Sequence, residues 1–218
     1  LAAMAASPYC MLISISLPNK NNINNIKKIV KGIRWSIKKT KLKLLGGDLC
    51  SYNGPLSFCV TVIGTATNNY LLKRKGAKSG DYLIVTGNIG DSKIGLDCLE
   101  KKINDISVVD KNKAIKRFLI PPLRHELAIS LSPYVKSCID ISDGLVIDAG
   151  KLAKSSECGL KIESSKIPLS NLAKKILKKN YYSIEDLLSA GDDYELAFAV
   201  DKANIEKIKN IALSRKTK

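Results

Sequence analysis

The 218-residue sequence predicts a mixed α/β fold, in which short apolar strands alternate with amphipathic helices. Two segments, residues 10–17 and 56–65, are rich in apolar and β-branched side chains, as is typical of strands. Between them, residues 22–39 place apolar side chains at the spacing of one helix face. The composition, 45% hydrophobic and 26% charged, is that of a globular chain that buries a core.

The remaining elements continue this alternation. Residues 1–6 look like the end of a helix; further strands are expected over 81–86, 137–141 and 196–200, and helices over 92–101, 124–131, 142–156, 172–179, 184–188 and 203–214. Pro121 and Pro122 interrupt the helical pattern, so we expect a domain boundary between residues 1–120 and 121–218. The chain does not begin with Met and its last helix is followed by no strand, so we expect it to be part of a longer protein.

The net charge, the hydrophobic runs and the cysteines indicate which partners and which cellular location to expect. A net charge of +16 leaves a nucleic-acid-binding protein open as an alternative. The lysines are spread along the chain without interleaved aromatics or a known binding motif, so we expect no nucleic-acid partner. No apolar run reaches the roughly 18–20 residues that cross a bilayer, so we expect no membrane segment. Six scattered cysteines without a C-x-x-C pair favour reduced thiols and a cytoplasmic location.

Four glycine-and-acid motifs are the main functional signal, and we expect each of them to form a turn. They are Gly46-Gly47-Asp48, Gly87-Asn88-Ile89-Gly90-Asp91-Ser92, Asp140-Ile141-Ser142-Asp143-Gly144 and Gly191-Asp192-Asp193-Tyr194-Glu195. Each alone has a structural explanation, because Gly-Asp is common in turns and Asp often caps a helix. Their recurrence next to apolar strands indicates a shared site.

The third motif carries the chemical argument. Strand alternation places Asp140 and Ser142 on one face, and Asp143 lies where the strand gives way to a helix. Two carboxylates that converge at one strand edge repel each other unless a cation lies between them, and Mg²⁺ suits oxygen ligands and phosphates. Neighbouring glycines let backbone N–H groups approach phosphate oxygens. Carboxylates with a metal, and no Ser-His or Cys-His pair, point to phosphoryl transfer.

The ordered motifs resemble the thiamine-monophosphate kinase family, in the superfamily of aminoimidazole ribonucleotide synthetase. The resemblance covers nearly the whole chain and also includes Gly54-Pro55-Leu56-Ser57 and Arg74-Lys75-Gly76-Ala77-Lys78-Ser79-Gly80-Asp81. It implies a two-domain aminoimidazole ribonucleotide synthetase-like fold, with an ATP-binding and dimerisation domain in residues 1–120, truncated at its start, and a second α/β domain in residues 121–218. It also implies a homodimer and in-line transfer from ATP to thiamine monophosphate.

The resemblance implies binding residues and assigns no catalytic side chain. ATP contacts are expected at Gly47, Asp48, Arg74 and Ser142, magnesium ligands at Asp48, Asp140 and Asp143, and a contact to the thiamine moiety at Asp192.

Departures from the family pattern keep other interpretations open. Leu49 and Cys50 stand where the family usually has two threonines, and the family's acidic N-terminal segment and aromatic C-terminal contact would lie outside this sequence. We therefore expect little kinase activity from this chain alone. The alternatives are a sister ATP-dependent synthetase of the same superfamily and a non-catalytic remnant of a kinase.

Overall fold

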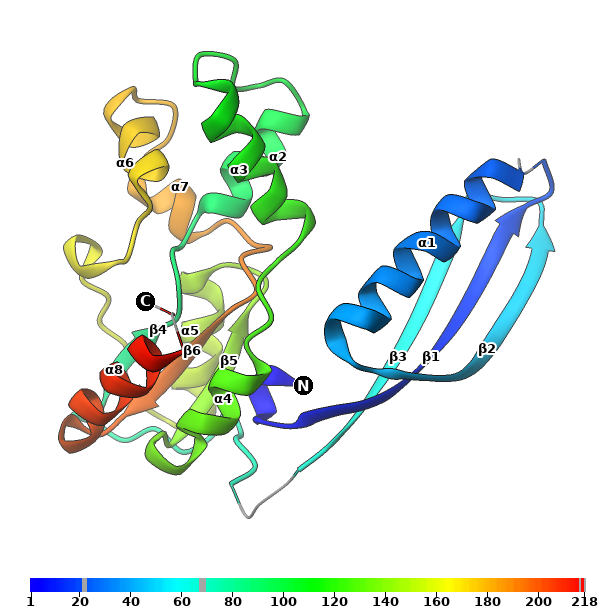
Figure 1. Ribbon diagram of the computed structural model, residues 1–218. Coiled ribbons are helices and arrows are strands. Elements are labelled where there is room, and N and C mark those ends of the chain that lie inside the picture. The colour runs from blue at the N-terminus through cyan, green and yellow to red at the C-terminus, as the bar shows by residue number, and fades with distance from the viewer. Residues whose placement is uncertain (21–22, 67–69, 216, 218) are drawn as a thin grey trace. The chain divides into compact units, whose positions relative to one another are not determined.

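The computed structural model describes residues 1–20, 23–66, 70–215 and 217, and the chain forms two compact units (Figure 1). Unit 1 comprises Leu1 and Ala6–Asn69, and unit 2 comprises Ala2–Ala5 and Tyr70–Lys218. Each unit has its own three-stranded sheet. None of the helices that the structure describes combines the length and the apolar character needed to cross a membrane.

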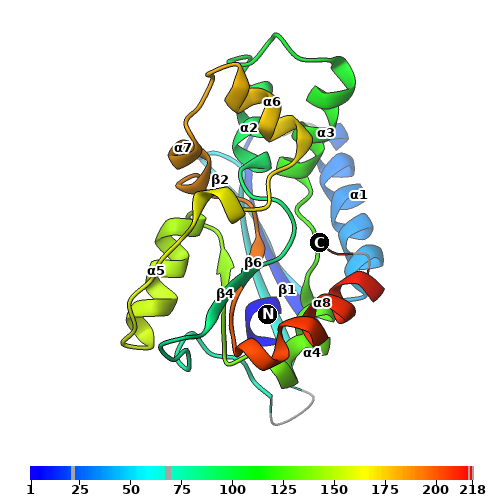
Figure 2. The same cartoon turned by 90° about the vertical axis from the view of Figure 1, so that its left-hand side faces the viewer.

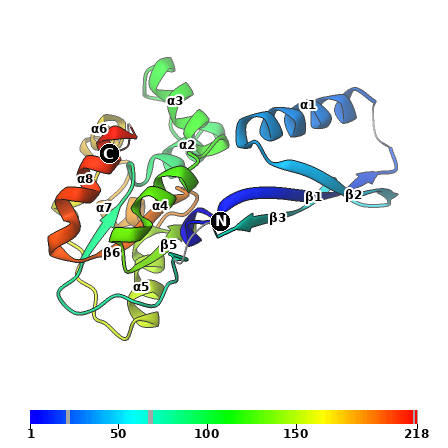
Figure 3. The same ribbon diagram turned by 60° about the horizontal axis from the view of Figure 1, so that its bottom comes forward.

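Unit 1 is a sheet with strand order β2-β1-β3, formed by β1 (Ser7–Pro18), β2 (Lys43–Tyr52) and β3 (Ser57–Thr65). Helix α1 (Ile23–Thr40) connects β1 to β2, which lie parallel, and it covers one face of the sheet (Figure 3). Met11 and Ile13 of β1 are buried with Leu42 against Ile33 and Ile37 of α1. The helical spacing of the isoleucines therefore predicted the face that packs.

Much of the apolar surface of unit 1 remains exposed. Phe58, Val60 and Val62 of β3 pair with alternate residues of β1, so they share one face of the sheet, yet they are 40–52% exposed. On β2, Leu45 and Leu49 are each 62% exposed. Exposed apolar side chains in a row on one strand are typical of an interaction site.

Unit 2 is built on an antiparallel sheet with order β4-β6-β5, formed by β4 (Tyr82–Val85), β5 (Ser137–Ile141) and β6 (Glu195–Val200). Leu196, Phe198 and Val200 of β6 pack with α4 (His125–Leu131) and α8 (Ile205–Ser214). The alternate residues Ala197 and Ala199 pack with α5 (Leu145–Ser155). Every residue of β6 is buried, because helices cover both faces of the sheet (Figures 1 and 2).

A third cluster of helices lies beyond the end of the sheet. It contains α2 (Asp91–Leu99), α3 (Val108–Leu119), α6 (Asn171–Lys178) and α7 (Ile184–Leu188), which bury a core of their own. Figure 2 shows these helices grouped together above the sheet. Short 3-10 turns complete the described chain at Ala2–Met4, Ser132–Tyr134, Ser164–Lys166 and Lys202–Asn204.

Most predicted elements are confirmed, and residues 137–141 and 184–188 match β5 and α7 at both ends. Residue 22, the expected start of α1, lies outside the described residues. The expected turn at Gly46-Gly47-Asp48 is wrong, because these residues lie inside β2. That strand contains two glycines and no β-branched residue, so only its pairing with β1 makes it a strand. Helix α3 was not predicted either.

The double proline lies within unit 2 rather than between the two units. Pro121 and Pro122 separate α3 from α4, and both helices belong to unit 2. Arg117 on α3 and Arg124 before α4 both bind Glu195 of β6. The prolines therefore end a helix but do not separate the two compact units.

Candidate functional site

The loop between β5 and α5 is held by one buried carboxylate. The backbone N–H groups of Ser142, Asp143 and Gly144 donate to Oδ2 of Asp148, at 2.9, 2.8 and 3.2 Å. Asp148 lies in the first turn of α5 and is 1% exposed. Gly144 has a φ of 123°, a backbone conformation that residues with a side chain rarely adopt. Because Asp148 takes all three N–H groups, this loop does not present them to a phosphate as the glycine pattern had suggested.

The fixed loop turns the Asp143 carboxylate outward. Its side chain is 58% exposed and pairs with the ammonium of Lys151, which also contacts Oδ1 of Asp148 at 2.8 Å. The ammonium of Lys151 therefore offsets part of the negative charge of Asp143 and Asp148.

The Gly191–Glu195 motif lies against the same loop. The N–H of Asp192 donates to the carbonyl of Ser142 at 2.9 Å, and the N–H of Tyr194 donates to that of Ile141 at 2.8 Å. Asp192 and Tyr194 both have left-handed backbones, with φ of 66° and 48°. Such values are unusual for residues other than glycine, and for a bulky aromatic they mark a conformation that the surroundings impose.

The Tyr194 phenol lies in the field of three carboxylates. It donates to Oδ1 of Asp192 at 3.2 Å. Its pKa is raised above its ordinary value, first by burial, then by the charge and hydrogen bond of Asp192, and then by the charges of Asp140 and Asp143. The backbone hydrogen bonds of Asp192 and Tyr194 thus bring the Gly191–Glu195 motif against the loop that carries Asp140 and Asp143, although the two motifs are far apart in the sequence.

This donor set has the chemistry that suits Mg²⁺. Among the described residues, no group of three or more His, Cys, Asp or Glu side chains is arranged to hold a metal ion. Magnesium does not require one, because it keeps several waters and commonly binds through one or two carboxylates together with substrate phosphates. Asp140 and Asp143 supply carboxylate oxygens of the required kind.

Gly47 and Asp48 lie in unit 1, on β2. A Cβ on Gly47 would come within 1.7 Å of the carbonyl oxygen of Ile13, so only glycine permits the strands to pair here. The exposed Asp48 carboxylate accepts the N–H of Leu49 at 2.9 Å. The sequence placed these residues in a turn, whereas the structure presents Asp48 from a regular strand.

Arg74 lies in unit 2, at the other end of β5 and α5 from Asp143. The neighbouring carbonyl of Lys73 accepts the N–H of Cys138, near the start of β5, at 2.9 Å. The carbonyl of Arg74 accepts from Ser156, which caps the end of α5, at 3.3 Å. The structure therefore does not bring Arg74 to the loop that contains Ser142 and Asp143.

A cavity of about 600 Å³ opens beside Asp192. Its walls are Gly191 and Asp192, the first turn of α2, and residues of α7 and its surroundings. Three of the lining side chains are acidic, Glu185, Asp186 and Asp192, against the single cation Lys93. Buried in this wall, the hydroxyl of Ser92 has no hydrogen-bond partner among the residues that the structure describes. The cavity suits a positively charged organic group with a polar end.

Sequence reasoning missed two residues that shape this site, Asp148 and Tyr194. Asp148 follows Gly144 by four positions, in the first turn of the predicted helix, where a carboxylate reaches back to free N–H groups. That spacing was a usable signal. No comparable signal marked Tyr194, because its left-handed backbone depends on contacts with β5.

Two family models match the chain in order. The AIR synthase related protein N-terminal domain matches residues 1–66, and the corresponding C-terminal domain matches residues 78–217. The chain belongs to the AIR synthase related protein family. The expected fold family is confirmed, and the division between the two matches falls near the division between the two compact units.

Several thiamine-monophosphate kinases are similar to this chain in sequence. That of Buchnera aphidicola subsp. Schizaphis graminum is 39% identical over 219 residues, which cover 99% of this chain and 65% of the relative. That of Escherichia coli K12 is 33% identical, with 94% of this chain and 62% of the relative covered. The chain thus spans somewhat less than two thirds of the length of these relatives.

Solved structures of thiamine-monophosphate kinases are also similar to this chain. The thiamine-monophosphate kinase of Stenotrophomonas maltophilia matches with a TM-score of 0.90 and 28% identity, over 100% of this chain and 69% of that one. A structure described as AaThiL complexed with AMPPCP and TMP matches with a TM-score of 0.84 and 30% identity, over 93% and 64%. Escherichia coli HypE has a TM-score of 0.80 at 17% identity, which indicates a shared fold alone.

Proposed function

We propose that this chain carries the phosphotransfer site of a thiamine-monophosphate kinase, which moves the terminal phosphate of ATP onto thiamine monophosphate. The observation that supports this most directly is the backbone pairing of Asp192 with Ser142, which brings Asp192 against the loop that carries Asp140 and Asp143. The similarity to thiamine-monophosphate kinases, one solved with AMPPCP and TMP, favours this reaction among those of the superfamily.

In the proposed reaction an oxygen of the substrate phosphate attacks the γ-phosphorus of ATP in line, and ADP leaves, so that thiamine diphosphate is formed. In unit 2, Asp140 and Asp143 would hold magnesium, and in unit 1 Asp48 is the proposed magnesium ligand. When bound, magnesium supplies positive charge that neutralises the transferring phosphoryl group. The proposed ATP contacts are Arg74 and Ser142 in unit 2, and Gly47 and Asp48 in unit 1. Lys151 holds Asp143 in place, since its ammonium pairs with both Asp143 and Asp148.

The cavity beside Asp192 would bind the thiamine end of the substrate. The thiazolium ring carries a fixed positive charge, and the excess of acidic side chains in the cavity wall is the complement of that charge. Asp192 would lie beside this ring, and its hydrogen bond from Tyr194 fixes the direction of the carboxylate.

We further propose that unit 1 forms a homodimer through its exposed sheet. Phe58, Val60 and Val62, together with Leu45 and Leu49, expose apolar surface that a second copy would bury. A cytoplasmic location fits the cysteines, since all six are free thiols and Cys50 and Cys59 are exposed.

The direct test is binding of AMPPCP and thiamine monophosphate by calorimetry, with and without Mg²⁺, together with ADP release as the measure of turnover. The Asp143→Ala variant should lose the magnesium-dependent part of nucleotide binding. Asp105→Ala removes a carboxylate that is 78% exposed and is likewise paired with a lysine, Lys179, and it should behave like the wild type.

The possible outcomes separate the candidate functions. Unchanged nucleotide affinity in Asp143→Ala would refute the metal assignment. Turnover only with selenide or a formylglycinamidine substrate would identify a sister synthetase instead. Binding of neither ligand by the chain would favour the non-catalytic alternative.

A further inference from the structure

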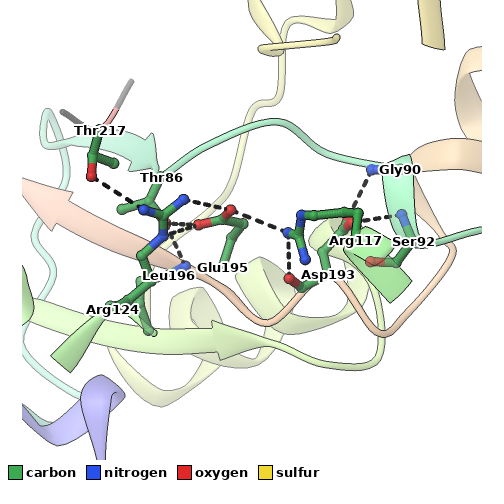
Figure 4. Close-up of polar contacts among 9 residues, drawn as sticks. All are labelled: Thr86, Gly90, Ser92, Arg117, Arg124, Asp193, Glu195, Leu196 and Thr217. Carbon is green, nitrogen blue, oxygen red and sulfur yellow. Dashed lines mark hydrogen bonds and ion pairs between the residues drawn. The ribbon is translucent and has the colours of Figure 1, made fainter. Parts of the chain in front are cut away.

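A buried network of charged side chains includes Asp193 and Glu195 of the Gly191–Glu195 turn, together with Arg117 and Arg124 (Figure 4). At its centre, the Glu195 carboxylate is 1% exposed. Arg124 donates to both of its oxygens, from Nε at 2.6 Å and from Nη2 at 2.8 Å. The Thr86 hydroxyl donates to Oε2 at 2.5 Å and accepts the N–H of Leu196 at 2.9 Å. Glu195 therefore anchors the start of β6 to the end of β4 and to the segment before α4.

A second arginine reaches the turn itself. Arg117, on α3, donates from Nη2 to the backbone carbonyl of Asp193 at 2.6 Å and to Oε1 of Glu195 at 3.1 Å (Figure 4). Its side chain is 17% exposed. Its second terminal nitrogen, Nη1, is buried and has no partner in the part of the chain that the structure describes. Nη1 of Arg117 is therefore buried without a hydrogen bond, which is unfavourable, whereas Nη2 holds the turn through the Asp193 carbonyl.

The opposite side of the turn is fixed by Asp193. This side chain is fully buried, and its carboxylate accepts the N–H of Gly90 at 2.7 Å and that of Ser92 at 3.4 Å, at the start of α2. The carbonyl and the side chain of one residue are therefore held from two directions. The neighbours of Asp193 in the sequence are Asp192 and Tyr194, and both have left-handed backbones. Such backbones persist only where the surroundings over-determine them.

We propose that Arg117 is a positioning residue for the ligand-binding turn: by holding the Asp193 carbonyl, it keeps Asp192 and Tyr194 in the left-handed conformation that presents both side chains beside Ser142. The nature of the ligand at this turn rests on the proposed function. The positioning itself rests only on the contacts of Arg117.

Arg117 is separable from the anchor of the network. When Arg117 is replaced, Glu195 keeps its two hydrogen bonds from Arg124 and the one from Thr86, so the carboxylate stays paired. The contact that disappears without a substitute is the one to the Asp193 carbonyl. A change at Arg117 should therefore loosen the turn and leave the sheet intact.

Amide hydrogen exchange of the ¹⁵N-labelled 218-residue chain tests this. In the wild type, the amides of Asp192 and Tyr194 are expected to be protected, because they donate to Ser142 and Ile141. In Arg117→Gln both should exchange at least 10-fold faster. The amides of residues 142–144, which donate to Asp148, should be unchanged. Arg117→Lys retains a donor for the carbonyl and should largely restore protection.

Binding provides the second measurement. Calorimetry should give about a 10-fold weaker affinity of Arg117→Gln for thiamine monophosphate, with unchanged affinity for AMPPCP. Arg215→Gln is the control, because the Arg215 side chain is 47% exposed and contacts Glu126 and Ser130 rather than the turn. If the wild type binds no thiamine monophosphate, the proposed function fails, while the exchange result still decides the role of Arg117.

The proposal is overturned by any of three results. The first is unprotected Asp192 and Tyr194 amides in the wild type, and the second is unchanged exchange at these amides in Arg117→Gln. The third is loss of protection throughout β5 and β6 or loss of the fold, because Arg117 would then support the whole unit rather than position the turn.

Discussion

Removing the Asp148 carboxylate should destabilise unit 2 more than removing any exposed acid of the site. Three backbone N–H groups converge on its Oδ2, at 2.8 to 3.2 Å. Hydrogen bonds to a charged acceptor contribute about 1.5–3 kcal/mol each. Ser142 and Asp143 are not fully buried, so water replaces part of this in the variant. We therefore expect Asp148→Ala to lower the free energy of unfolding by about 3 kcal/mol.

For a chain of this size, such a loss lowers the melting temperature by about 10 °C. Asp148→Asn keeps one acceptor oxygen without the charge and should lose about half as much. Asp143→Ala is the matched control, because its 58%-exposed carboxylate pairs only with a lysine, and its stability should stay close to that of the wild type.

Urea unfolding followed by far-UV circular dichroism is the appropriate assay. Tryptophan fluorescence would report on unit 1, because Trp35 is the only tryptophan and lies on α1. If Asp148→Ala unfolded at the same urea concentration as Asp143→Ala, the three hydrogen bonds would contribute nothing measurable, and the account of the loop would be wrong.

Three further predictions follow from burial and from glycine contacts. Burial raises the pKa of Asp193 to about 6, so the folded chain binds more protons than the unfolded chain between the ordinary value of 3.8 and that value. The free energy of unfolding of the wild type should therefore fall by about 3 kcal/mol as the pH rises through this window. Urea unfolding at the low-pH and the high-pH end of the window measures this change, which should be absent in Asp193→Asn. Gly87→Ala places a Cβ 2.1 Å from a Glu195 carboxylate oxygen and should cost about 3 kcal/mol in the same assay; Gly80→Ala, also left-handed but with no atom within 4 Å, should cost about 1 kcal/mol. Gly47→Ala should disrupt the pairing of β2 with β1, measured by Trp35 fluorescence during unfolding, whereas Gly46→Ala, with open space around it, should not.

The sequence predicted those parts of the fold whose cause is local. Strand β5 and helix α7 were found with their correct ends, because β5 carries apolar Cys138, Ile139 and Ile141 and α7 follows the capping residue Ser183. The Asp140–Asp143 motif was correctly placed at the junction of a strand and a helix. The family could also be identified from the order of the motifs.

Strand β2 and the Pro121-Pro122 boundary show where local patterns fail. Nothing in residues 43–52 distinguishes a strand from a glycine turn, since the hydrogen bonds that make it a strand come from β1, beyond an intervening helix. The prolines do break a helix, but the arginines on either side of them bind one glutamate in β6. Pattern reasoning detects the break and cannot detect the shared partner.

By itself, then, the sequence determined the alternation of strands and helices and the family, and it predicted acids for the candidate site. The tertiary structure alone decided how those acids are held. Arg124 and Glu195 are 71 positions apart, and Arg117 and Glu195 are 78 apart. The left-handed turn at Asp192 and Tyr194 depends on the end of β5. The physical reason is that buried charges and strained backbones are stable only with partners, and folding brings those partners from distant parts of the chain.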